Sequence, residues 1–153
     1  MKWRSLRSKG ESDAFGNTIS KMALEVNIPS GITCAQSKKV TDNDTAATFG
    51  SGLLAVYATP ALVALMEHSA HKAVEHLLPE GLTTVGVEMQ VHHLKATPVG
   101  ATVEARAVLE EVDGRRLVFQ IEAHDDAGLI GTARHVRFIV DRERFLRKVY
   151  PNG

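Results

Sequence analysis

Two residues have side chains and surroundings suited to acid–base chemistry. Glu67 stands at the margin of an apolar helical pattern, where a partly desolvated carboxylate can serve as a base or a nucleophile. His93 continues the apolar alternation of residues 85–91, so we expect its ring to point into the interior with them. Each residue also has a structural interpretation, as a solvated helix-flank glutamate and a hydrogen-bonded core histidine. The pattern alone leaves both interpretations open.

Other candidate sites carry weaker signals. His68 and His71 are three residues apart, but a surface histidine pair explains them, so we predict no metal site. Cys34 has no activating neighbour, and residues 50–52 (Gly-Ser-Gly) are typical of a flexible turn. The sequence contains no G-x-S-x-G, phosphate-loop or dinucleotide-binding motif. We therefore expect no cofactor.

One long helix must position Glu67. Thr59 is a plausible N-cap and Pro60 a plausible first helical residue, and apolar residues then recur at three- and four-residue spacing up to Leu78. This pattern predicts a helix over residues 59–78 with one wide buried face. Before it we expect a strand at 33–40 and a short helical or irregular segment capped by residues 41–45.

After the helix the apolar period changes from about 3.6 residues to two. The alternation predicts a strand from residue 83, a hairpin over 101–124 with its turn at Asp113-Gly114, and a strand over 130–140. Connections this short exclude helical crossovers, so we predict an α+β fold in which an antiparallel sheet wraps around the one long helix. Residues 141–149 are compatible with a short helix. The exposed edge of such a sheet favours dimerisation.

Composition places limits on the class of protein. The 153 residues are 44% hydrophobic and 24% charged, and 18 basic and 18 acidic side chains give a formal net charge of +0. These values indicate a globular domain with no nucleic-acid partner. Residues 1–21 lack periodicity and are predicted to be a disordered N-terminal tail, followed by a single domain over 22–153. With one cysteine and no apolar run that could be a signal or a membrane span, we expect a cytoplasmic protein with no membrane partner.

Eight short segments, taken in order between residues 33 and 147, match a known pattern. They are Gly50-Ser51-Gly52-Leu53-Leu54, Ala58-Thr59-Pro60, Ala64-Leu65-Met66-Glu67, Thr83-Thr84-Val85-Gly86, His93-Leu94-Lys95-Ala96-Thr97-Pro98-Val99-Gly100, Asp113-Gly114-Arg115-Arg116-Leu117, Glu122-Ala123-His124-Asp125 and Leu129-Ile130-Gly131. Together they resemble the fluoroacetyl-CoA thioesterase-like branch of the hotdog superfamily. The resemblance implies a hotdog fold, usually a homodimer, which in turn could pair into a dimer of dimers.

The resemblance also implies roles for five residues. The family's catalytic threonine, glutamate and histidine match Thr59, Glu67 and His93, and its substrate-binding glycine and arginine match Gly86 and Arg137. Glu67 would be the nucleophile or general base and His93 the acid–base partner, while the Thr59 hydroxyl would orient Glu67 or the attacking water. Arg137 would hold the acyl end or the thioester carbonyl, and Gly86 would leave room for close approach.

Two departures from the pattern bear on the substrate. The fluoroacetyl enzyme has an aromatic-rich lid ahead of the threonine, whereas residues 50–55 here read Gly-Ser-Gly-Leu-Leu-Ala. Val136 stands where relatives commonly carry glutamate, which we expect to alter the charge beside Arg137. A small or short-chain acyl-CoA is therefore the expected substrate. The alternatives are a non-catalytic hotdog module that binds acyl-CoA or a related ligand and, ranked last, an enoyl-CoA hydratase.

Overall fold

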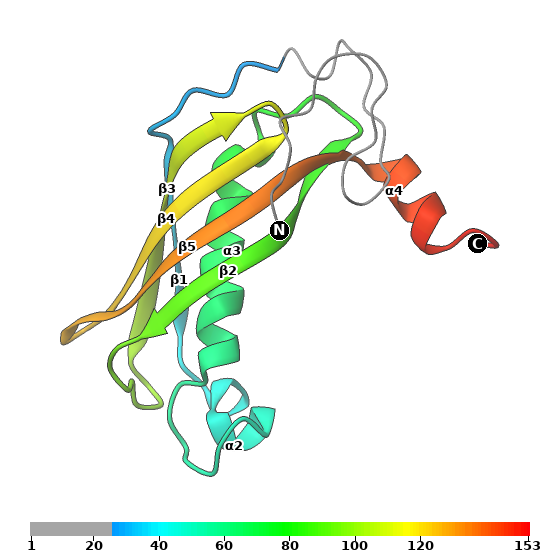
Figure 1. Cartoon of the computed structure of the whole chain (residues 1–153). Coiled ribbons are helices and arrows are strands. Elements are labelled where there is room, and N and C mark those ends of the chain that lie inside the picture. Colours follow the sequence, from blue (N-terminus) through cyan, green and yellow to red (C-terminus); the bar gives the residue numbers. More distant parts are fainter. Residues whose placement is uncertain (1–25) are drawn as a thin grey trace.

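The predicted α+β architecture is confirmed in the computed structural model, which describes residues 26–153 (Figure 1). The predicted tail at 1–21, and the start of the domain at 22, lie outside the described residues. The elements are β1 (Thr33–Lys39), the 3₁₀ turn η1 (Asp42–Asp44), α2 (Ala46–Phe49), α3 (Thr59–Glu75), β2 (Leu82–His93), β3 (Thr102–Asp113), β4 (Arg116–Asp125), β5 (Gly128–Asp141) and α4 (Arg142–Val149).

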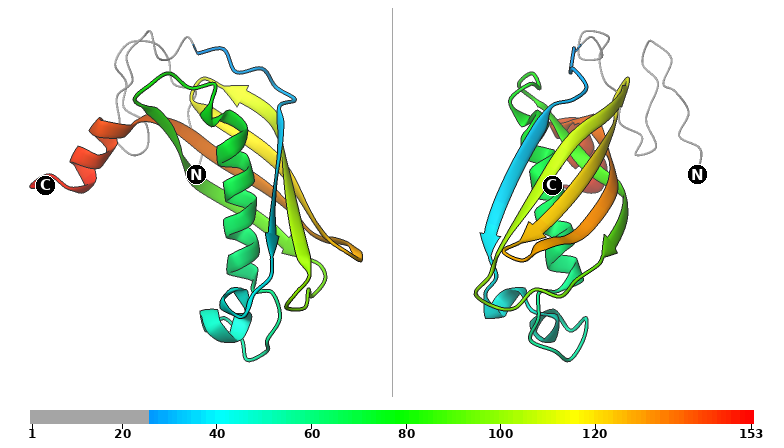
Figure 2. Two further views of the ribbon diagram at one scale, coloured as in Figure 1. Left: turned by 180° about the vertical axis from the view of Figure 1, so that it is seen from behind. Right: turned by 90° about the vertical axis from the view of Figure 1, so that its left-hand side faces the viewer.

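A five-stranded sheet curves around α3. The strand order is β1-β3-β4-β5-β2, and every neighbouring pair is antiparallel. Helix α3 lies across the concave face and contacts β1, β2, β3 and β4, whereas α4 extends away from the sheet (Figures 1 and 2). Strands β1 and β2 form the two edges. No helix within residues 26–153 has the length and apolar character needed to cross a bilayer.

The core lies between α3 and the concave face of the sheet. Leu62, Met66, Ala70 and Val74 recur at four-residue spacing and are 0% exposed, so the predicted helical stripe is the buried one. From the sheet they meet inward-facing residues of β3 and β4, which include Leu109, Leu117, Phe119 and Ile121. This packing fixes the rotation of α3 about its axis and hence the direction of Glu67, which stands beside the stripe.

A β-bulge in β2 interrupts the two-residue alternation that the sequence predicts for this strand. The register with β5 shifts between Gly86 and Glu88. Val85 and the bulged residue Val87 pack on the convex face with Phe138, whereas Met89 and Val91, beyond the bulge, pack against the main core on the concave face. The expectation that all four residues share the His93 face is therefore wrong for Val85 and Val87, because one extra residue in a strand reverses the alternation.

Helix α3 differs from the prediction at both ends. It begins with Thr59 as its first residue, and Ala58 occupies the N-cap position without a side-chain hydrogen bond. It ends at Glu75, three residues before the predicted boundary, and turn-type bonds follow it, including one from the Leu77 N–H to the Val74 carbonyl. The predicted capping role of Thr59 is wrong, and its hydroxyl is free for another partner.

Candidate active site

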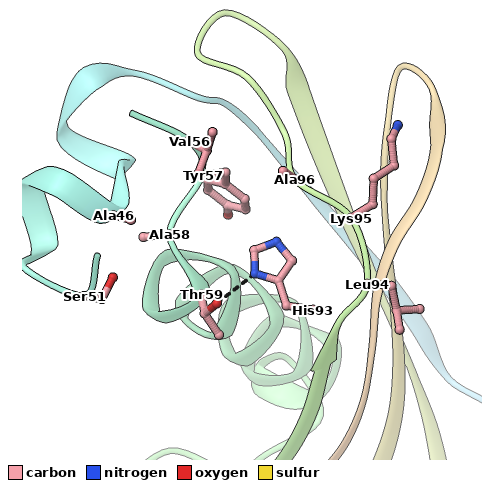
Figure 3. A pocket seen from close by; sticks show the side chains of 10 residues that line it. All are labelled: Ala46, Ser51, Val56, Tyr57, Ala58, Thr59, His93, Leu94, Lys95 and Ala96. Atoms are coloured by element: carbon pink, nitrogen blue, oxygen red, sulfur yellow. Dashed lines mark hydrogen bonds between the residues drawn. The ribbon is translucent and has the colours of Figure 1, made fainter. Parts of the chain in front are cut away.

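The Thr59 hydroxyl pairs with the imidazole of His93. Thr59 Oγ1 lies 2.8 Å from His93 Nδ1, which joins the start of α3 to the end of β2 (Figure 3). The Tyr57 ring stands edge-on to the His93 ring, with centroids 6.5 Å apart. A hydroxyl at hydrogen-bond distance from a neutral imidazole nitrogen can exchange a proton through that nitrogen.

Backbone hydrogen bonds hold the two halves of this pair together. The Tyr57 N–H donates to the Thr97 carbonyl at 2.9 Å, and the Ala58 N–H donates to the Asp44 carbonyl at 2.8 Å. The chain entering α3 is thereby fixed against the segment that leaves β2. Beside the pair lies a pocket of about 370 Å³, which falls within the usual size range of ligand pockets. Small side chains, including Ala46, Ser51, Ala58 and Ala96, line much of it (Figure 3).

The His93 ring is held neutral near pH 7. Burial lowers the pKa of His93 below its usual value, and the nearby Lys95 backbone opposes this shift in part. Nε2 is buried and makes no hydrogen bond to any of the described residues. The pocket is therefore reached from Nδ1, through the exposed hydroxyl of Thr59.

Glu67 belongs to a second cluster, on the next turns of α3. Its Oε2 atom lies 3.2 Å from Arg137 Nη1 and 3.8 Å from His135 Nε2. The Glu67 side chain is 42% exposed, whereas those of Arg137 and His135 are 8% and 1% exposed. A carboxylate within reach of solvent is thus backed by a buried guanidinium, and burial lowers the pKa of Arg137 while Glu67 opposes that shift.

Gly86 leaves the space that this cluster occupies. A Cβ atom built on Gly86 would stand 2.5 Å from Glu67 Oε2, 3.1 Å from His135 Cε1 and 3.3 Å from Arg137 Nη1. Any other residue would collide with the carboxylate, so the glycine matters here for space. The β2 bulge directly follows it and turns position 86 toward α3.

We expect Gly86→Ala to lower kcat/KM roughly 100-fold, because the added methyl group displaces the Glu67 carboxylate by about an ångström. The free energy of unfolding should change little, since the atom that must move is the end of a flexible side chain. Turnover kinetics and urea unfolding of the variant check both values. Wild-type kcat/KM in a folded Gly86→Ala protein would contradict this prediction.

The two clusters are separate within one chain. Glu67 follows Thr59 by eight positions along α3, a rise of about 12 Å at 1.5 Å per residue. The structure thus brings Thr59 to His93, and Glu67 to Gly86 and Arg137, but it does not bring the five predicted residues to one point. Thr59 bonds His93 rather than Glu67.

Two residues of the second cluster, Thr84 and His135, were not predicted from the sequence as part of the site. Arg137 Nε donates to Thr84 Oγ1 at 2.9 Å, and Arg137 Nη1 lies 3.1 Å from His135 Nε2. The signal for His135 was available, because residues i and i+2 of a strand share a face. Val136 lies on the opposite face, fully buried against Val118 and Phe138. A residue at 136 therefore does not set the charge beside Arg137, contrary to the expectation.

The remaining candidates stay apart from both clusters. His71 Nε2 lies 3.7 Å from Glu75 Oε1, and no group of three or more metal-ligating side chains occurs among residues 26–153. Cys34 is half-buried on edge strand β1 and accepts a hydrogen bond from Gln36 at 3.5 Å. Neither site has a geometry that points to chemistry.

The buried histidines predict a pH dependence of stability. Burial lowers the pKa of both His93 and His135, so between the unfolded value of about 6.5 and the lower folded value the unfolded chain binds more protons than the folded chain. The free energy of unfolding should therefore fall as the pH drops below about 6.5. Urea unfolding at pH 7.5 and pH 5.5 measures it. Equal or greater stability at pH 5.5 would show that these rings are not held neutral.

A five-stranded antiparallel sheet wrapped around one long helix defines a hotdog-like fold. A hot-dog-like protein from Thermanaerovibrio acidaminovorans is 30% identical to the chain, with a TM-score of 0.75 over 82% of this chain and 94% of the other. A thioesterase superfamily member from Thermus thermophilus is 28% identical, with a TM-score of 0.75 over 82% and 95% of the two chains.

Sequence comparison identifies the family within this fold. The sequence profile of the fluoroacetyl-CoA-specific thioesterase family matches residues 40–143, and the chain belongs to that family. The fluoroacetyl-CoA thioesterase of Streptantibioticus cattleyicolor is 39% identical over 94 residues, which are 61% of this chain and 68% of the relative. A solved structure of the fluoroacetyl-CoA-specific thioesterase has a TM-score of 0.78 at 30% identity, over 83% of this chain and 98% of the other.

Proposed function

We propose that this chain hydrolyses a small or short-chain acyl-CoA to the free acid and CoA, using Thr59, Glu67 and His93. The observation that carries the proposal is the Thr59–His93 pair beside a pocket of about 370 Å³ lined largely by small side chains. Solved relatives support the ligand class, because fluoroacetyl-CoA-specific thioesterase variants were captured with fluoroacetate and CoA and with acetyl-CoA.

Hydrolysis needs an oxygen nucleophile at the thioester carbon and a proton for the departing sulfur. We assign the first task to Glu67, which attacks the carbonyl carbon itself or takes a proton from the attacking water. The carbon–sulfur bond then breaks, and the Thr59–His93 pair donates the proton that the thiolate receives. Where Glu67 itself attacks, the acyl group is left on it as an anhydride, and water cleaves that anhydride to release the free acid and restore the carboxylate. Arg137 holds the Glu67 carboxylate or the acyl end, and Gly86 leaves the room for it.

A homodimer would unite the two clusters. Among the described strands, β2 is paired on one side only, by β5, so its other edge is available to a second copy of the chain. Antiparallel pairing about a two-fold axis between Met89 and Gln90 would set Gly86 opposite the partner subunit's His93. Both helices would then lie on one face of a continuous sheet. We propose that Glu67 of one subunit serves the Thr59–His93 pair of the other, and that no cofactor takes part.

The loop ahead of α3 indicates how strongly the site selects a fluorinated acyl group. The side chains of Leu53 and Leu54 are 95% and 69% exposed, and this loop carries no aromatic residue between Gly50 and Val56. An aliphatic loop beside the pocket does not offer the polarised contacts that would select fluorine. We therefore expect acetyl-CoA and short-chain acyl-CoAs to be hydrolysed at rates within about tenfold of fluoroacetyl-CoA.

Thiol release from a panel of acyl-CoAs tests this function. The panel runs from fluoroacetyl and acetyl through short straight chains to aromatic acyl groups, each measured as kcat/KM. Preference for short chains with little selection for fluorine supports the proposal. Saturable acyl-CoA binding without thiol release would contradict it and would favour the non-catalytic module.

A further inference from the structure

His135 is a fully buried histidine that the proposed chemistry has not used. It sits on β5 with its side chain 1% exposed, directly beneath the Glu67–Arg137 pair. His135 Nδ1 lies 2.7 Å from the backbone carbonyl oxygen of Glu88, the residue that ends the β2 bulge. A carbonyl oxygen only accepts hydrogen bonds, so Nδ1 carries the hydrogen and donates it.

The other ring nitrogen is committed to Arg137. His135 Nε2 lies 3.1 Å from Arg137 Nη1, and because a guanidinium only donates, Nε2 accepts with its lone pair. The same Nη1 atom lies 3.2 Å from Glu67 Oε2. Arg137 Nε and Nη2 donate to the hydroxyl and the carbonyl of Thr84, at 2.9 and 3.0 Å. Every nitrogen of the guanidinium thus has a partner. Nη1, the nitrogen that contacts Glu67, has His135 Nε2 as its second acceptor.

The charges around the ring favour its neutral form. Arg137 faces it from β5, Glu67 faces it from α3, and the Phe119 ring of β4 lies with its centroid 6.4 Å away. Farther along α3, burial and then the Arg137 cation lower the pKa of His71. Burial lowers the pKa of His135, the Arg137 cation lowers it further, and Glu67 and the Glu88 carbonyl oppose the shift only in part.

We propose that His135 is the positioning residue of the site, a neutral imidazole of fixed tautomer that ties the β2 bulge to Arg137 and thereby aims Arg137 at Glu67. This inference rests on the proposed role of Glu67. A merely space-filling histidine would need neither hydrogen bond. A positioning histidine uses both, because the Glu88 bond sets the tautomer that leaves Nε2 able to accept from Arg137. An amide oxygen has no tautomer to be set, so in its place only the bond to Arg137 is required.

Two amide substitutions separate the two bonds. In His135→Asn the amide N–H can replace Nδ1 against the Glu88 carbonyl, but the acceptor that Nε2 offers to Arg137 Nη1 is lost, and Glu67 Oε2 is left as the acceptor for Nη1. In His135→Gln the longer amide oxygen can replace Nε2 as that acceptor, but the Glu88 bond is lost. We expect His135→Asn to lower kcat about 30-fold with KM within about twofold, and His135→Gln to recover most of kcat. His124→Gln, on the exposed face of β4, is the matched control and should keep wild-type values.

A spectroscopic readout keeps the inference independent of Glu67 chemistry. The ¹⁵N chemical shifts of the His135 ring should show a protonated Nδ1 and an unprotonated Nε2 at pH 7, and the ring should gain its second proton only below its usual pKa. Titration near pH 6.5, or a hydrogen on Nε2, would overturn the inference, as would wild-type kcat in His135→Asn when Glu67→Gln is inactive. If Glu67→Gln itself keeps wild-type turnover, the proposed function fails, and the ring shifts then decide the role of His135 alone.

Discussion

Glu67→Gln is expected to lower kcat/KM for the preferred acyl-CoA about 10³-fold, close to 4 kcal/mol of transition-state stabilisation. The amide keeps the size of the side chain and can still accept from Arg137 Nη1, but it neither attacks a thioester nor removes a proton from water. Thiol-release kinetics measure the loss, which should appear in kcat while KM changes little.

The stability of Glu67→Gln separates chemistry from folding. The Glu67 side chain is 42% exposed, so the charge that it contributes to Arg137 is partly screened by water. We expect the free energy of unfolding to fall by about 1 kcal/mol or less, and Glu75→Gln on the exposed part of α3 provides the matched control. Activity within threefold of wild type in Glu67→Gln would remove the residue from the mechanism.

His93→Asn should lower kcat about 10²–10³-fold, the range typical of a lost general acid–base group. The asparagine amide can occupy the place of Nδ1 and retain a hydrogen bond to Thr59 Oγ1, so the geometry of the pair survives while proton exchange does not. The lower limb of the wild-type pH–rate profile, set below about pH 6.5 by the lowered pKa of His93, should vanish in the variant.

Thr59 distinguishes proton exchange from simple positioning in that pair. Thr59→Ser keeps the hydroxyl and should retain most of the wild-type rate, whereas Thr59→Val keeps the shape and loses the bond to Nδ1. If His93→Asn and Thr59→Val both hydrolyse acyl-CoA at the wild-type rate, the pair is structural.

The elements of the fold could be predicted from sequence because each has a local signal. The apolar stripe of α3, the alternation in the later strands and the turn glycines belong to neighbouring residues. The strand order could not be predicted in this way. Strand β1 pairs with β3 although η1, α2, α3 and β2 lie between them in the chain, and that choice depends on which faces bury one another.

The candidate site was predictable residue by residue but not in its arrangement. Thr59 was expected to cap α3, yet its hydroxyl bonds His93, because the tertiary contact takes precedence over the local signal. The bulge at Val87 was invisible to a two-residue period, and it is the feature that lets Gly86 and His93 share one face. His135 shares a face with Arg137, two residues on, but its second bond is to the backbone carbonyl of Glu88 on another strand, which no local pattern predicts.

A complementation experiment tests most directly whether the two clusters form one active site across a dimer. Glu67→Gln and His93→Asn proteins are unfolded together, refolded as a mixture and assayed for thiol release. Random pairing makes half the dimers mixed, and each mixed dimer has one site with both wild-type groups, so the mixture should show about a quarter of wild-type activity. Activity no higher than the sum of the two separate variants would contradict it, and would place Glu67 and His93 of one chain in the same site or in none.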